Sequence, residues 1–218
     1  MFLRHCRGAG TYNMKRLALA VLLLTVLLVV VLLSMPPEKH LGRLLTVIYL
    51  HGALIRAGAL LFLLGGVAGM VALITGDERA WRWTTALQIT SWSTWTLGFV
   101  VSFYPSYVTW GSAIVWSEPR TRMVVQVALV SAFLFLLARW LEERVWVAVS
   151  SIVVGVTLPL LLWRTGVIRH PLDPVGTSPS AALRLSYLTV LSIVILLGLT
   201  VTAWVVERTH VKRVPTST

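Results

Sequence analysis

The sequence predicts an all-α integral membrane protein with six transmembrane helices and an outward, tryptophan-rich amphipathic loop. Of its 218 residues, 57% are hydrophobic and only 12% are charged, and the mean hydropathy of +0.83 lies outside the range of ordinary soluble domains. Apolar runs long enough to cross a bilayer recur along the whole chain. The basic residues lie in short groups between these runs, as in the loops of a polytopic membrane protein.

The six predicted spans differ in character. Pro36 and Pro37 should end the first span, because proline cannot continue the hydrogen-bond ladder of a helix. Eight Ser, Thr and Gln residues in the third span predict a face turned toward the interior of the bundle. Pro159 predicts a kink near the end of the fifth. The predicted spans are residues 17–33, 44–75, 83–101, 123–141, 145–163 and 183–206.

We expect one domain, since the sequence shows no internal repeat and no second hydrophobic unit. Residues 1–16 form a predicted cytoplasmic N-terminal segment, residues 17–206 a single six-helix transmembrane domain, and residues 207–218 a cytoplasmic tail. The run over 17–33 is long for a signal peptide, and no small-x-small cleavage site follows it, which favours a retained anchor. Met14 is an alternative start, and a mass measurement of the native N-terminus would distinguish the two.

The distribution of basic residues predicts the orientation. With the N-terminus in the cytoplasm, the larger share of the 19 Lys and Arg residues falls on the cytoplasmic side. Both termini are then cytoplasmic, and the plasma membrane is the expected location. The start of the second span, the aromatic segment 103–122 and the loop 164–182 would all face outward.

Composition excludes several classes of function. The net charge of +11 does not indicate a nucleic-acid partner, because the basic residues do not follow one face; anionic lipid headgroups of the bilayer explain them. The single cysteine, Cys6, permits no intrachain disulfide and no C-x-x-C-H haem attachment. The sequence contains no phosphate-binding loop of the NTPase type. It also offers no nucleophile–base constellation, so we do not expect an enzyme.

The segment 103–122 combines aromatic rings, prolines, one acidic residue and two arginines. Such a segment can lie at a membrane surface with its rings among the headgroups. It is also the surface that a large, planar, anionic ligand would need. The residues that suggest this are Phe103, Tyr104, Tyr107, Trp110, Gly111, Trp116, Glu118, Arg120 and Arg122.

Two histidines share the predicted outer face with this segment. A neutral imidazole ligates haem iron through one ring nitrogen, and two imidazoles fill both axial positions. His51 and His170 could therefore bind one haem, with Trp110 and Trp116 covering the porphyrin. Candidate partners for the haem propionates are the outer arginines Arg56, Arg120, Arg122, Arg164 and Arg169.

Simpler explanations exist for each of these residues. A histidine at a membrane interface can bond a headgroup or a backbone carbonyl, and His40 is a weaker alternative ligand. Arg120 and Arg122 can serve as topology anchors. Many tryptophans near span ends belong to ordinary aromatic belts: Trp81, Trp83, Trp140, Trp146, Trp163 and Trp204.

Three stretches carry a resemblance to a known family. One runs from Pro36 to the string IYLHG that contains His51, one runs from Trp110 to Arg120, and the third is His170 between the fifth and sixth spans. Over residues 16–206 the chain resembles the CcmC-type haem-handling proteins of cytochrome c maturation, which carry a tryptophan-rich WWD motif.

The resemblance implies six spans and two outward histidines that flank the tryptophan motif. It implies that haem b is held transiently and non-covalently at the outer face and delivered to a membrane haem chaperone. It also implies partners: an ABC-transporter-type ATPase and further membrane subunits of the maturation complex.

The sequence departs from the family pattern at several positions. The adjacent tryptophans usual in the motif are replaced by Ala113, Ile114 and Val115, the acidic residue is Glu118 rather than Asp, and Pro171 follows the second histidine. The predicted axial ligands of iron are His51 and His170. The full predicted haem-binding set is His51, His170, Trp110, Gly111, Trp116, Glu118, Arg120 and Arg56.

Two other functions remain open at this point. A b-type cytochrome subunit of an electron-transfer complex would keep its haem permanently, usually between helices. A small transporter component would use the polar third span as a path.

Overall fold

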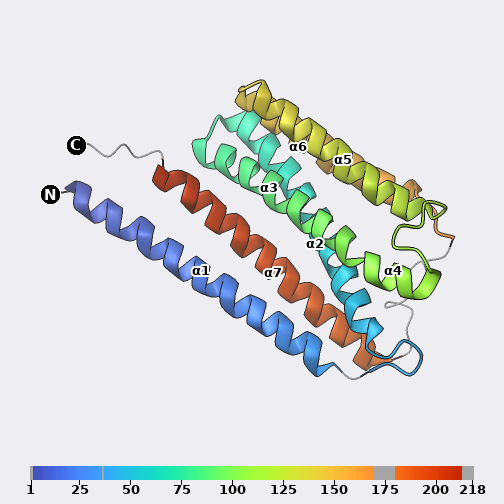
Figure 1. The fold of residues 1–218 in the computed structure, drawn as a ribbon. Coiled ribbons are helices and arrows are strands. Elements are labelled where there is room, and N and C mark those ends of the chain that lie inside the picture. The colour runs from blue at the N-terminus through green and yellow to red at the C-terminus, as the bar shows by residue number, and fades with distance from the viewer. Residues whose placement is uncertain (1, 36, 169–179, 213–218) are drawn as a thin grey trace.

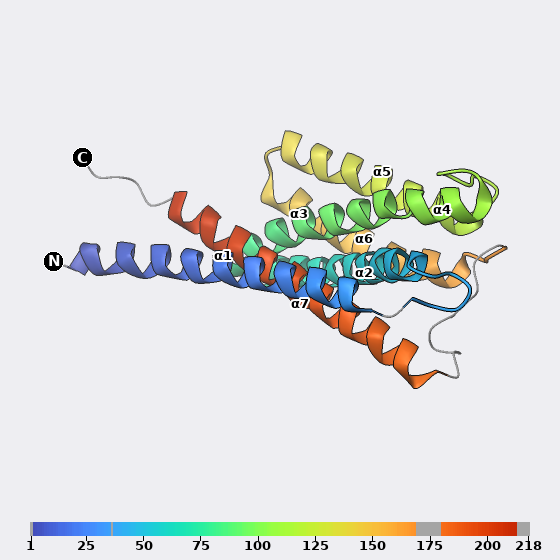
Figure 2. The ribbon, with the colours of Figure 1, turned by 60° about the horizontal axis from the view of Figure 1, so that its bottom comes forward.

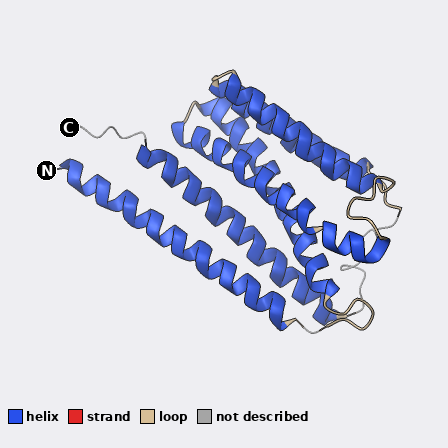
Figure 3. Cartoon of the chain, viewed as in Figure 1, coloured by secondary structure: helices blue, strands red, loops and turns tan. Residues whose placement is uncertain are grey.

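The computed structural model describes residues 2–35, 37–168 and 180–212, and the secondary structure of these residues is almost wholly helical (Figure 3). The all-α prediction is therefore confirmed. The helices are α1 (Phe2–Ser34), α2 (Leu44–Thr75), α3 (Glu78–Val101), α4 (Phe103–Trp110), α5 (Pro119–Trp140), α6 (Arg144–Arg164) and α7 (Ala181–Lys212).

The long helices run back and forth along one axis (Figure 1). Helices α1 and α7 form one side of the bundle, α5 and α6 form the other, and α2 and α3 lie between them. One end, which we call the α4 end, holds α4, the connection 35–43 and the start of α7. The other, the terminal end, holds the start of α1, the end of α7 and the short α2–α3 and α5–α6 connections (Figures 1 and 2).

Helix α2 is the centre of the packing, and glycines bring its neighbours close. A Cβ atom added at Gly58 would lie 3.0 Å from the backbone nitrogen of Trp95 in α3. One added at Gly69 would lie 2.9 Å from the carbonyl oxygen of Ala148 in α6. One added at Gly66 would lie 3.3 Å from the Cα atom of Gly155, which is also in α6. The small residues of the second span thus permit close helix packing.

Five helices are long and apolar enough to cross a membrane, which supports a multi-pass membrane protein. These segments are Asn13–Ser34, Leu44–Thr75, Pro119–Trp140, Arg144–Arg164 and Ala181–Thr209. Each coincides with one of the predicted spans. The predicted first span and residues 2–16 of the N-terminal segment belong to one continuous helix, α1, and α7 continues past residue 206.

The third predicted span forms α3, which is not among those five because of its polar content. Its 24 residues would extend about 36 Å, enough to cross a bilayer. Four of its polar side chains are buried, as predicted for an interior face: Thr84, Gln88, Thr90 and Ser91.

Polar side chains of α3 join it to three other helices. The Gln88 amide lies within hydrogen-bond distance of the Val147 carbonyl oxygen (2.7 Å) and of the hydroxyl of Ser150 (2.8 Å) in α6. The hydroxyls of Thr90 and Thr202 in α7 are 2.8 Å apart. The indole N–H of Trp95 donates to the Val124 carbonyl in α5 at 3.0 Å. These hydrogen bonds, in addition to apolar contacts, hold α3 inside the bundle.

Candidate functional site

The aromatic segment 103–122 is not one continuous loop, contrary to the sequence prediction. Its first part is the helix α4, and its last residues begin α5 at Pro119. Pro105 lies in the first turn of α4, where a missing N–H removes no helical hydrogen bond. Gly111 ends α4 with φ 73°, and its N–H donates to the Tyr107 carbonyl at 2.9 Å. Glycine suits this left-handed C-terminal position because it has no Cβ.

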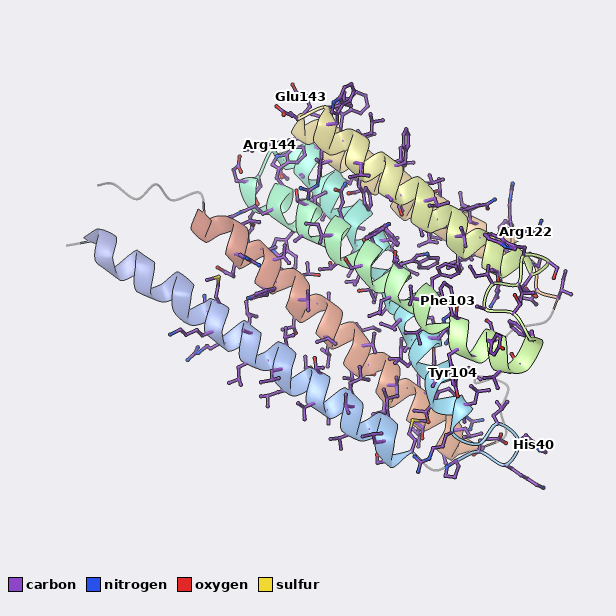
Figure 4. The ribbon with its side chains drawn as sticks, in the orientation of Figure 1. His40, Phe103, Tyr104, Arg122, Glu143 and Arg144 are labelled. Carbon is purple, nitrogen blue, oxygen red and sulfur yellow. The ribbon has the colours of Figure 1, made fainter. Side chains whose placement is uncertain are left out.

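The aromatic rings of this segment face different surroundings. Tyr104, Tyr107 and Trp116 are about 60% exposed, at 60%, 64% and 58% respectively. Trp110 is half-buried, and Phe103 packs edge-on against Phe99 of α3 with ring centroids 4.9 Å apart. Figure 4 shows Phe103 and Tyr104 on α4, with Arg122 and His40 at the same end of the bundle. The exposed rings form an aromatic surface rather than a closed pocket.

His51 lies near the start of α2, half-buried, with its ring against the end of α3. Its Nδ1 atom is 2.8 Å from the carbonyl oxygen of Gly98. Because a carbonyl only accepts hydrogen bonds, Nδ1 carries the proton, and in the neutral ring Nε2 is then the unprotonated nitrogen. This arrangement is the one in which a histidine ligates a metal through Nε2 while a backbone carbonyl orients the ring.

Gly98 was not among the predicted site residues, although the structure makes it the partner of His51. A Cβ atom at this position would lie 3.0 Å from the Cδ1 atom of Ile55 and the Cβ atom of Leu54. The glycine thus permits α3 to approach α2 where the imidazole reaches the carbonyl. A lone glycine near the end of a polar span is the only signal that the sequence offered.

Glu118 is fully buried, and it precedes the first residue of α5. Both of its carboxylate oxygens lie 3.3 Å from the backbone nitrogen of Ile168, which donates to them. This contact joins the loop after α4 to the loop after α6. The second predicted ligand, His170, and the predicted propionate partner Arg169 lie outside the residues that the structure describes.

The predicted arginines that the structure describes differ in their surroundings. The Arg120 side chain is partly buried, and its Nε atom has no hydrogen-bond partner among the described residues. Arg122 and Arg164 are exposed. Arg56 lies over the ring of Tyr187 in α7, with its Cζ atom 5.1 Å from the ring centroid.

Arg56 and His51 therefore contact different helices. Two residues that are five positions apart on one α-helix are separated by about 140° around its axis. The structure consequently turns His51 toward α3 and Arg56 toward α7. Of the predicted propionate partners, Arg120 is the one with a buried donor that lacks a partner in the described part of the chain.

The donor chemistry at the α4 end suits haem. His51 offers an oriented imidazole, Trp110 and Trp116 offer apolar area, and Arg120 offers a cation for a carboxylate. Within the described ranges, no three His, Cys, Asp or Glu side chains come together as a bare metal site.

The sequence matches no known protein-family model, and no curated protein is significantly similar to it.

Proposed function

We propose that this chain binds haem at the α4 end and delivers it to a membrane haem chaperone for c-type cytochrome assembly. The observation that carries the proposal is the 2.8 Å contact between His51 Nδ1 and the Gly98 carbonyl, which sets the tautomer needed for ligation through Nε2. The resemblance of the chain to CcmC-type proteins suggests the same function. The haem is cargo, and the chain makes and breaks no covalent bond of the porphyrin.

Each residue of the proposed site has a separate task. His51 and His170 are the axial ligands, and the bound iron supplies the visible spectrum by which binding is followed. Trp110, Gly111 and Trp116 provide the surface against which the flat ring system lies. Arg120 pairs with a propionate, and Glu118 acts indirectly by holding the chain before His170 through Ile168. Arg56, which stacks on Tyr187, plays a supporting part in α2–α7 packing instead.

The proposal includes six spans, with α3 as the third. Both termini then lie in the cytoplasm and the α4 end faces outward across the plasma membrane. An ABC-transporter-type ATPase and further membrane subunits would supply the energy for release of the haem.

The test is the visible absorption spectrum of the detergent-purified full chain, oxidised and reduced. We expect a Soret band that is lost or shifted in His51→Ala and in His170→Ala. His40→Ala is the matched control, because His40 is an exposed histidine at the same end. A wild-type protein that is colourless and takes up no added haem would overturn the proposal, as would equal loss in the His40 control.

A b-type cytochrome subunit is the second candidate, and one observation favours it: His51 belongs to a membrane span and bonds a neighbouring helix, as ligands of a permanent haem commonly do. The two functions differ in the fate of the haem. Transfer of haem from the purified protein to an added haem-chaperone domain supports the carrier. A reversible redox titration without any transfer supports the electron-transfer subunit.

A transporter path along α3 has less support. The described polar side chains that make it distinctive bond within the bundle, as Gln88 does with α6 and Thr90 does with α7. Unaltered function of a haem-free His51→Ala protein would nevertheless favour that alternative.

A further inference from the structure

The terminal end of the bundle, far from His51, contains a groove of about 580 Å³ between three helices. Helix α7 packs against both α1 and α3, so it forms the floor of the groove and the other two helices form its walls (Figure 1). The volume lies within the roughly 300–1,000 Å³ typical of small-ligand sites. The residues that line it are Asn13, Arg16, Leu17, Arg79, Arg82, Trp83, Ala203, Val206 and Glu207.

The lining residues follow one pattern on every helix. Each helix contributes positions i, i+3 and i+4, which lie on a single helical face. On α1 and α3 that face carries arginines, Arg16 on the first and Arg79 and Arg82 on the second. Glu207 on α7 is the one carboxylate among the lining residues, so the groove has a net positive charge. Three arginines from two helices thus line one space.

The groove also lies at the depth where the apolar segments end. The uncharged run of α1 begins at Leu17 and that of α7 ends at Val206, and α2 ends at Thr75 just before α3. A phospholipid places its phosphate at this level and its acyl chains deeper. Trp83 lines the groove at the same depth, where indole rings are favoured.

Deeper along the bundle, α1 leaves room for acyl chains. It packs mainly against α7, and Leu28 is the one buried residue among the described residues 13–34. On the face of α1 that lines the groove, the next large apolar residues below Leu17 are Val21 and Leu24, and both are half-buried. An apolar wall therefore continues below the basic groove.

We propose that this groove is a binding site for an anionic phospholipid. Its phosphate binds Arg79 and Arg82 with Arg16 opposite, and its chains follow α1 into the bilayer. Guanidinium groups suit this ligand because they form paired hydrogen bonds with phosphate oxygens. The site is independent of haem binding at the α4 end.

Native mass spectrometry of the delipidated full chain tests the proposal, with phosphatidylglycerol and phosphatidylcholine of identical acyl chains as probes. We expect wild type to retain phosphatidylglycerol preferentially. Arg79→Gln/Arg82→Gln should weaken that retention roughly ten- to thirtyfold. Lys15→Gln/Arg139→Gln is the matched control, since it removes two positive charges at the same end from residues that do not line the groove; it should retain the lipid.

A second variant guards against misfolding of the first. Glu207→Gln removes the carboxylate from the groove, so its retention of phosphatidylglycerol should rise. Equal retention of the two lipids by wild type, equal loss in the Lys15/Arg139 control, or weaker retention by Glu207→Gln would each overturn the proposal. Release of the bound lipid by inorganic phosphate would also overturn it, because the site would then serve a water-soluble anion.

Discussion

At the scale of single residues, Glu118 has the most demanding position in the molecule. It is a fully buried carboxylate, and it joins the segment before α5 to the backbone of Ile168. A buried carboxylate is tolerated only where donors satisfy it, so this contact fixes two loops that are distant in sequence. The sequence singled out Glu118 as part of a tryptophan motif but could not show its partner, which is a backbone N–H fifty positions away.

Replacing that carboxylate with the isosteric amide tests its role. Glu118→Gln should speed hydrogen exchange of the Ile168 amide about tenfold, because a charge-assisted hydrogen bond becomes a weaker neutral one. Glu143→Gln is the matched control, as Glu143 precedes α6 in the same way and its side chain makes no capping bond. Unchanged exchange at Ile168, measured by NMR or by mass spectrometry, would contradict the assigned contact.

At the scale of helices, α2 is the element that the rest of the bundle packs around. Its glycines touch backbone atoms of both α3 and α6, so the space between the helices is set by the absence of side chains. Without a hydrophobic driving force between helices in lipid, such close packing is a main source of association.

Gly69→Ala should therefore destabilise the α2–α6 pair by about 1–3 kcal/mol, since the new methyl group meets the Ala148 carbonyl. Gly166→Ala provides the control, because a Cβ there meets nothing within 4 Å. Thermal unfolding in detergent measures the difference. Equal melting temperatures for the two variants would contradict a tight contact between Gly69 and Ala148.

The helices show which sequence signals were sufficient. The second predicted span and α2 share the bounds Leu44–Thr75, because a predominantly apolar run, with Arg56 as its one Lys or Arg residue, lies between Arg43 and the Gly76 turn. The aromatic segment was predicted as a loop from its prolines and glycine. Pro105 in fact occupies a first helical turn, where proline is compatible with a helix. Proline can therefore begin a helix or interrupt one, and the contacts of the neighbouring residues decide which of the two occurs.

At the scale of the whole molecule, the crossing made by α3 decides between a topology of five spans and one of six. Apolarity supports five crossings, yet α3 spans the length of the bundle between its two ends (Figure 1). Hydropathy could not identify it because polar residues lower its mean hydropathy, although Gln88 and Thr90 bond to neighbouring helices. The candidate site shares this limitation: the sequence located His51, but not the Gly98 carbonyl that orients it.

Single cysteines test the crossing directly in a Cys6→Ser background. We expect Asp77→Cys, before α3, and Ser112→Cys, after α4, to react with a membrane-impermeant maleimide from opposite sides, with position 112 outward. Both sites are exposed, so each should label readily once its side is accessible. Labelling of both from one side would mean that α3 does not cross, and the six-span topology would fall.

The packing of α1 mainly on α7 has a consequence for biosynthesis. Because α7 follows α2 to α6 in the chain, α1 meets its main partner only after those helices have been made. Until α7 enters the bilayer, α1 is a solitary anchor surrounded by lipid, and the bundle from α2 to α6 assembles beside it. A chain truncated before residue 181 would keep its anchor and its α2–α6 packing, but its first helix would have nothing to dock on. Completion of α7 is thus the step that gives α1 its packing partner.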